Sequence, residues 1–293
     1  MDCECYVRVS DIDETLEVLS SHDGRARVIA GGTDLMLGLR FGREHARVLV
    51  DISDVAELRY IRRTDGQIAV GPVTTHAELA ASPLVRQAAT ALAAAAASVG
   101  SPQIRNVGTV GGNIVNALPA ADTAVALLAL DAQIEITDQT GMRTSELIDL
   151  YVGVGQSTLD PSREILTGIR FQAPTCSSFQ RLARRKAFAL PVLNAAVALW
   201  LDEGGLCRGA RVCVAPVGPK PWRALGAEEA LKGRPLTEET ILAAGQAATE
   251  EAVCRDSIRG CSEYREAMVK VLVERALRAS AGQSSPQPGD SSP

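Results

Sequence analysis

The chain has 293 residues, of which 46% are apolar and only 3% aromatic, and its formal net charge is −5. This length allows two domains of ordinary size, and the acidic balance with few aromatic side chains argues against nucleic-acid binding. No apolar run reaches the ~18 residues that a membrane-spanning helix needs, and the acidic start lacks the pattern of a signal peptide. We therefore expect a cytoplasmic protein.

The N-terminal part of the chain alternates helical and strand patterns. Ser10 and Asp13 form a capping-box-like start for a helix. Residues 26–30 and 47–52 are apolar and rich in β-formers, which predicts two short strands around that helical unit. The sequence thus begins with a small α/β unit.

A predicted hairpin follows, with strands at 58–63 and 67–71 joined by Thr64-Asp65-Gly66. The alanine-rich run 84–99 predicts one helix. Residues 122–130 predict a further helix.

The later segments indicate a second hairpin at 133–144 and a strand at 164–171. Past Pro174 the character changes, with apolar strand-like stretches at 192–201 and 209–218 and helical patterns at 239–253 and 263–279. We place a domain boundary there, giving domains 1–173 and 174–279. The Ser/Pro/Gly-rich tail 280–293 is expected to be disordered.

Cysteine and histidine positions give no support for a metal site. No two cysteines have C-x-x-C spacing, and the three histidines are not clustered with them. We expect reduced thiols, as in a cytosolic protein. The cysteines are Cys3, Cys5, Cys176, Cys207, Cys213, Cys254 and Cys261.

Two glycine-rich segments carry the most chemical information: IAGGTDLM at 29–36 and GTVGGN at 108–113. Glycine lets backbone N–H groups approach an anion closely, and consecutive amides in a turn can form a concave phosphate site. Thr33, Thr109 and Asn113 offer further donors. A Gly-Gly pair is also the ordinary signature of a tight turn, so the pattern alone leaves both interpretations open.

Common catalytic and nucleotide motifs do not occur. Neither segment matches G-x-G-x-x-G, and the chain has no P-loop, H-E-x-x-H or G-x-S-x-G. Asp34 and Asp122 lie at expected helix starts, where an acid also stabilises the helix dipole. We therefore predict no catalytic side chain.

The two segments AGGTDLM and IRNVGTVGGNIVNALPAAD resemble the FAD-binding medium subunit of molybdenum hydroxylases. That family includes the flavin subunits of xanthine dehydrogenase and aerobic carbon monoxide dehydrogenase. The resemblance extends to about residue 279 and includes VDISDVAELRYI, FQRLARRKAFALPVLNAAVAL and SEYREAMVKVLVERAL.

The resemblance implies an α+β fold. A two-subdomain FAD-binding domain of the vanillyl-alcohol-oxidase (PCMH) type, divided at about 1–54 and 55–173, precedes a smaller C-terminal domain with a short antiparallel sheet and helices. Both glycine segments would bind the pyrophosphate of FAD, the only cofactor expected. The implied binding residues are Ala30, Gly31, Gly32, Thr33, Asp34, Leu35, Val99, Gly100, Thr109, Gly111, Gly112, Asn113, Asp122, Leu166 and Arg181.

The chain departs from its relatives at one position of this set. Relatives commonly carry a lysine just after the aromatic residue in the stretch that matches FQRLARR, where this chain has Gln180 and Arg181. Arg181 would supply the positive charge, but a planar guanidinium is not equivalent to an ammonium group. The replacement bears on flavin tuning rather than on flavin binding.

The resemblance also implies partners and a role. A molybdenum cofactor-binding large subunit would hydroxylate the substrate, and a small subunit with two two-iron iron–sulfur clusters would carry electrons to this chain. NAD or another acceptor would receive them, in a heterotrimer or a dimer of heterotrimers. Two alternatives remain: a FAD-binding regulatory or assembly subunit without turnover, and a stand-alone flavin oxidase.

Overall fold

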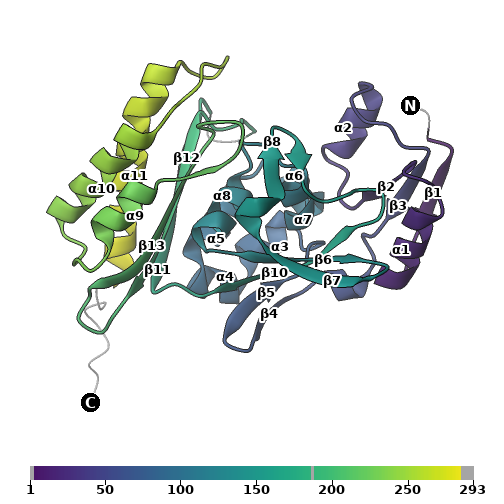
Figure 1. Ribbon diagram of the computed structural model, residues 1–293, viewed down its shortest axis with the longest axis horizontal. Helices are drawn as coiled ribbons and strands as arrows, with labels where there is room; N and C mark the ends of the chain where they lie inside the picture. The colour runs from purple at the N-terminus through teal and green to yellow at the C-terminus, as the bar shows by residue number, and fades with distance from the viewer. Residues whose placement is uncertain (1–2, 186–187, 285–293) are drawn as a thin grey trace.

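The computed structural model describes residues 3–185 and 188–284, which fold into sheets and helices arranged in layers along the long axis of the molecule (Figure 1). The N-terminal layer is a parallel sheet in the order β1-β3-β2. Its elements are β1 (Cys5–Arg8), α1 (Ile12–Ser20), β2 (Ala26–Ile29), α2 (Leu35–Arg40), β3 (Val48–Asp51) and the 3-10 turn η1 (Ala56–Leu58).

Helix α1 begins one residue away from the predicted cap. Asp11 is the N-cap and accepts from the Glu14 backbone N–H at 2.8 Å, while the Glu14 carboxylate accepts from the Ser10 backbone N–H at 2.7 Å. The predicted pairing of Ser10 with Asp13 was therefore wrong by one position, and the Glu14 carboxylate bonds the residue before the N-cap rather than the N-cap itself.

The second sheet is antiparallel, in the order β4-β5-β10-β6-β7. Its strands are β4 (Ile61–Thr64), β5 (Gln67–Val70), β6 (Gln133–Asp138), β7 (Gly141–Glu146) and β10 (Ile165–Gln172). The two predicted hairpins are confirmed. In the first, Thr64 pairs with Gln67, so the turn is only Asp65-Gly66, with φ of 52° and 77°. Positive φ at both turn residues is the signature of a type I′ hairpin.

A group of short helices covers the inner face of this sheet (Figure 1). They are α3 (His76–Ala81), α4 (Pro83–Ala88), α5 (Thr90–Ser98), α6 (Pro102–Val107), α7 (Val110–Val115) and α8 (Asp122–Ala129). The predicted single helix over 84–99 is wrong, because Ala89 leaves the helical region at φ −151° and ψ 61° and separates α4 from α5. The turn η2 (Leu147–Leu150) and the small pair β8 (Tyr151–Gly153) and β9 (Gln156–Ser157) complete this part.

The C-terminal part is an antiparallel sheet in the order β11-β12-β13-β14 with helices on its outer face (Figure 1). Its elements are β11 (Cys176–Leu182), β12 (Leu193–Leu201), β13 (Cys207–Ala215), β14 (Trp222–Arg223), α9 (Leu225–Leu231), α10 (Glu238–Glu251) and α11 (Ser262–Ser284). Helix α11 continues past the predicted end at 279. Residues 285–293 of the predicted disordered tail lie outside the described residues.

Strand β12 is buried on both faces, which explains why its residues are apolar apart from Asn194. Leu193, Val197 and Leu199 belong to a core shared with α9–α11, whereas Ala196 and Ala198 belong to the core of α5 and α8. Small alanine side chains on the inner face let the helices lie close to the sheet. The core around α5 and α8 is therefore shared between the two parts of the chain.

All seven cysteines are free thiols, as predicted. Within residues 3–185 and 188–284, no three His, Cys, Asp or Glu side chains are placed to hold a metal ion. In the same residues, no helix has the length and apolarity required to cross a membrane.

Candidate functional site

The structure brings the two glycine segments into direct contact. A Cβ built on Gly31 would overlap the carbonyl oxygen of Val107 and lie 3.0 Å from the Cα of Gly108. No side chain fits at that point, so the glycine is required by the close approach of two backbones. Segments that are about 75 residues apart in sequence therefore form one surface (Figure 1).

The first segment leads from β2 to α2 with unbonded donors. Among the described residues, the backbone N–H groups of residues 31–35 have no hydrogen-bond acceptor. Ala30 and Leu35 pack against the adjoining cores, and the Thr33 hydroxyl lies 3.5 Å from a carboxylate oxygen of Asp34. A run of free amides just before a helix is a favourable place for an anion.

The second segment differs from its prediction. Residues 110–113 are the first turn of α7 rather than a loop, and their backbone N–H groups all donate within the chain at 2.9 to 3.2 Å. Their acceptors are the carbonyls of Thr74, Pro72 and Thr109 and the Thr109 hydroxyl. The interpretation of this segment as a nest of free amides is therefore wrong.

The second segment has two side chains with donors left free among the described residues, and an open side, in place of free amides. The Thr109 hydroxyl accepts from Gly112 and keeps its own hydrogen, and Asn113 accepts from the Thr123 hydroxyl at 2.6 Å through Oδ1, which leaves its NH₂ group to donate. A Cβ on Gly111 would lie 2.5 Å from Pro72, whereas one on Gly112 would meet only Thr109 Oγ1 at 3.1 Å. Gly112 thus borders open space.

His76 packs against this segment, and it was not identified as a site residue from the sequence. Its backbone N–H donates to the Gly108 carbonyl at 3.0 Å, and its buried ring packs against Gly108. Within the described residues its Nδ1 has no hydrogen-bond partner. Burial, and secondarily the Arg105 charge, lower the pKa of His76 to about 4. The run VTTHAEL, with its single histidine, gives no sequence signal that His76 is buried against the second glycine segment.

Val99 and Gly100 end helix α5 and lie next to the C-terminal part. The Val99 carbonyl accepts from the Arg105 guanidinium at 2.9 Å, and the Gly100 carbonyl accepts from the Phe188 backbone N–H at 3.1 Å. This predicted pair therefore lies at the junction between the two parts of the chain.

Asp122 is buried at the first turn of α8 and is 5% exposed. Its carboxylate accepts from Arg181 Nε at 3.1 Å and from Asn194 Nδ2 at 2.6 Å. Burial raises the pKa of Asp122, while the Arg181 charge and the Asn194 and Ser98 side chains oppose that rise. The sequence pointed to Asp122 and Arg181 separately, but it gave no sign of their ion pair or of Asn194.

Leu166 lies away from the glycine segments' backbone network. It is 5% exposed on β10, pairs with Ile136 on β6, and belongs to the core beneath α5 and α8. No described hydrogen bond links its backbone to residues of either glycine segment.

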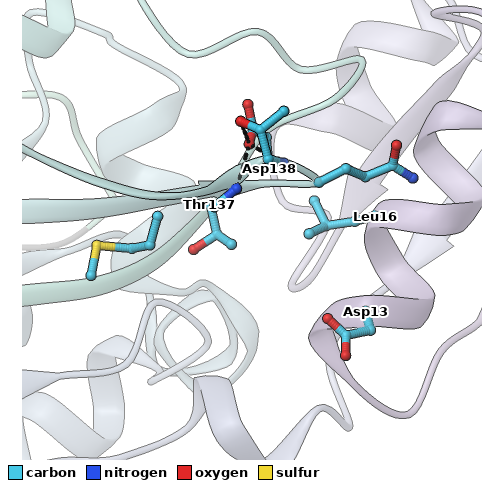
Figure 2. A pocket seen from close by; sticks show the side chains of 8 residues that line it. Asp13, Leu16, Thr137 and Asp138 are labelled. Atoms are coloured by element: carbon cyan, nitrogen blue, oxygen red, sulfur yellow. Dashed lines mark hydrogen bonds between the residues drawn. The ribbon is translucent and has the colours of Figure 1, made fainter.

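An open cleft elsewhere on the molecule is not part of this site. Figure 2 shows it between α1 and the tip of the β6–β7 hairpin. Its volume is about 640 Å³. Asp13, Leu16 and Thr137 line it, and Asp138 accepts from the Thr140 and Gly141 backbone amides of its own turn. None of the predicted binding residues lines this cleft.

Comparison with known proteins identifies the chain. Residues 2–174 match the family described as the FAD binding domain in molybdopterin dehydrogenase, and residues 178–280 match the CO dehydrogenase flavoprotein C-terminal domain. The chain belongs to the FAD subunits of the molybdenum hydroxylase family. This FAD subunit is therefore part of an oxidoreductase, and its cofactor is FAD.

Named relatives cover most of the FAD subunit. The nicotinate dehydrogenase FAD-subunit of Eubacterium barkeri is 36% identical over 73% of this chain and 74% of its own length. A putative xanthine dehydrogenase FAD-binding subunit of Escherichia coli K12 is 31% identical over 96% of this chain and 98% of its own length.

The fold is also that of a solved relative. A chain of carbon monoxide dehydrogenase from Hydrogenophaga pseudoflava superimposes with a TM-score of 0.90 at 28% identity, covering 97% of the FAD subunit and 99% of that chain. The mixed helix and sheet architecture with two domains is thereby shown.

Proposed function

We propose that this FAD subunit carries electrons within a multi-subunit molybdenum hydroxylase. It takes them from an iron–sulfur subunit and passes them to NAD or another acceptor, while a molybdenum-containing large subunit hydroxylates the substrate. The FAD-binding domain would be of the vanillyl-alcohol-oxidase type, with residues 1–54 and 55–173 as its halves and residues 174–279 as the C-terminal domain. A heterotrimer, single or doubled, is the proposed assembly.

One observation carries the proposal: the backbone contact of Gly31 with Val107, beside the unbonded amides of residues 31–35. These amides would donate to the pyrophosphate of FAD. Thr109 and Asn113 would add side-chain donors from the second segment, and the open side of Gly112 would leave room for the phosphates. When bound, FAD supplies the redox chemistry that joins one-electron donors to two-electron acceptors.

The remaining predicted residues would surround the other end of the cofactor. Val99, Gly100 and Asp122 lie where α5 and α8 meet the C-terminal sheet. Because Arg181 is paired with Asp122, its charge would act on a flavin only as one half of a neutral pair. This proposal differs from the free positive charge that a lysine would give.

The purified full chain tests the binding part of the proposal. We expect flavin absorption bands near ~370 and ~450 nm, as for flavins generally. A colourless protein that takes up no added FAD would contradict it.

Affinity purification of the native complex tests the electron-transfer part. Mass spectrometry is expected to recover a molybdenum-binding large subunit and a ferredoxin-like small subunit, and the hydroxylation substrate should bleach the flavin under anaerobic conditions. Bound FAD that is never reduced would favour a regulatory subunit. A monomer that oxidises a small substrate unaided would favour a stand-alone oxidase. Adding NAD, a quinone or oxygen to the reduced complex identifies the acceptor.

A further inference from the structure

The Asp122 carboxylate is held by a pair of side chains from the other domain. Arg181 on β11 and Asn194 on β12 are directly opposite one another in the antiparallel ladder. Arg181 Nε reaches one carboxylate oxygen at 3.1 Å and Asn194 Nδ2 reaches the other at 2.6 Å. Both oxygens of Asp122 are therefore positioned by the C-terminal sheet.

Among the described residues, the Asn194 side chain makes no hydrogen bond other than the one to Asp122. It is 0% exposed, and its Oδ1 has no partner among the described residues. Its neighbours on the same face of β12, Ala196 and Ala198, are small and apolar. A buried amide oxygen without a partner costs free energy that alanine at this position would avoid. The stability of the sheet therefore does not account for an asparagine here, whereas its bond to Asp122 does.

The orientation of the amide is determined by the carboxylate. With Asp122 ionised, only the NH₂ group of Asn194 can face Oδ1, because the reversed amide would oppose two acceptors. Arg181 is held at a second point, since it also donates to the Ala189 carbonyl. The result is a rigid, nearly neutral cluster rather than a free charge.

The cluster lies at the end of the site formed by Val99 and Gly100. Ser98, whose side chain opposes the rise in the pKa of Asp122, is the last residue of α5, and the Gly100 carbonyl accepts from Phe188 of the C-terminal domain. Helices α5 and α8 therefore meet the C-terminal sheet at the residues that are expected to surround the flavin.

We propose that Asn194 is a positioning residue of the flavin site, through which the C-terminal domain orients the Asp122 carboxylate and moderates its negative charge. This inference rests on the proposed function, because it takes Asp122 to face the flavin.

The variant Asn194→Ala in the full chain tests the proposal. Without the amide donor, the carboxylate loses a restraint, and the charge of its ionised form is less compensated. We expect FAD to bind about tenfold more weakly, and the reduced, more anionic flavin to lose more affinity than the oxidised form. A further tenfold difference between the two forms lowers the reduction potential by about 30 mV. Fluorescence titration and spectroelectrochemistry measure these effects.

Ser178→Ala is the matched control. Ser178 lies on β11 and donates a buried hydrogen bond to the Ala276 carbonyl at 2.6 Å, on the side of the sheet that faces α11. Its loss should lower the unfolding midpoint and leave the FAD dissociation constant and the reduction potential unchanged. Equal effects of both variants on flavin binding would overturn the proposal.

The double variant Asp122→Asn, Asn194→Asp distinguishes a role in orienting the carboxylate from a role in holding the two domains together. It can be used even if Asn194→Ala fails to fold. It restores a carboxylate–amide pair with the charge moved to β12. We expect the unfolding midpoint to recover while the potential and the FAD affinity remain altered. Full recovery of both flavin properties would overturn the proposal. A wild-type chain that takes up no FAD would instead overturn the proposed function itself.

Discussion

Glycines in the two site segments have different physical roles, although they are identical in the sequence. Gly31 and Gly111 face backbone or ring atoms of neighbouring segments, so any side chain there would displace the chain. Gly112 faces open space apart from the Thr109 hydroxyl. A substitution at Gly112 can therefore impair ligand binding without disturbing the fold, whereas a substitution at Gly31 or Gly111 disturbs both.

The variant Gly112→Val is expected to lose FAD with little loss of stability. The new side chain would occupy the open side of the segment, where the phosphates are proposed to bind. We expect FAD affinity to fall about tenfold or more and the free energy of unfolding to change by about 1 kcal/mol or less. Flavin content at 450 nm and urea unfolding measure the two.

Gly218→Val is the matched control, because a Cβ at Gly218 would meet nothing within 4 Å and lies in the C-terminal domain. It should retain full flavin content. Full flavin content in Gly112→Val as well would show that Gly112 does not border the phosphates.

His76 makes stability depend on pH. The folded chain keeps the imidazole neutral, with its pKa at about 4 instead of 6.5. Above pH 6.5 the group is neutral in both states and its contribution is complete. As the pH falls from 6.5 toward 4, the unfolded chain binds a proton that the folded chain does not, and up to about 3 kcal/mol of stability is lost.

The variant His76→Gln is expected to remove this part of the pH dependence. Urea unfolding of wild type and variant between pH 5 and pH 8 measures it, with the two stability curves converging toward acidic pH. Parallel curves would mean that the buried imidazole does not resist protonation.

At the scale of elements, local rules succeed where a turn is formed by adjacent residues. The Asp65-Gly66 turn requires positive φ at two consecutive residues, and the sequence supplies the pair that tolerates it. Local rules fail for the alanine-rich run 84–99. Helix propensity is high throughout, but the chain bends at Ala89 so that α4 and α5 both pack against the core.

Gly66→Ala is expected to destabilise the protein by about 1 kcal/mol. A Cβ at Gly66 would meet nothing within 4 Å, so the whole effect comes from its φ of 77°. Thermal unfolding measures the loss, and flavin content should not change. An equal loss in Gly218→Ala, which has no positive φ, would contradict this explanation.

At the scale of the whole molecule, the two domains are joined by apolar packing and by charge. Ala196 and Ala198 of β12 lie in the core of α5 and α8. Beyond the end of α8, Asp131 pairs with Arg211 at 2.8 Å and lies 3.7 Å from Arg223, both in the C-terminal domain. A shared core of this kind resists independent domain motion.

We therefore expect the full chain to unfold in one transition. Both tryptophans, Trp200 and Trp222, lie in the C-terminal sheet. Their fluorescence reports that domain, while far-ultraviolet circular dichroism reports both. Coincident midpoints are expected for a cooperative unit. Two separated midpoints would show that the domains fold independently.

The sequence by itself determined both hairpins, several of the other strands, the helical C-terminal part and the two glycine segments, because these features depend on residues close together in the chain. It gave no prediction for β1, β8, β9, β11 and β14. Its resemblance to a known family led to FAD, which family comparison confirmed. The tertiary structure decided which amides of these segments have an acceptor among the described residues: those of residues 31–35 have none, and those of 110–113 do.

Only the tertiary structure joined Asp122 to Arg181 and Asn194, and only it placed His76 beneath Gly108. These contacts span 32 to 72 residues of sequence, and no local pattern of charge or polarity encodes such a partner. The physical reason is that the charge state and hydrogen bonding of a buried polar group depend on the groups that replace water around it. Those groups come from different elements, and the fold alone brings them together.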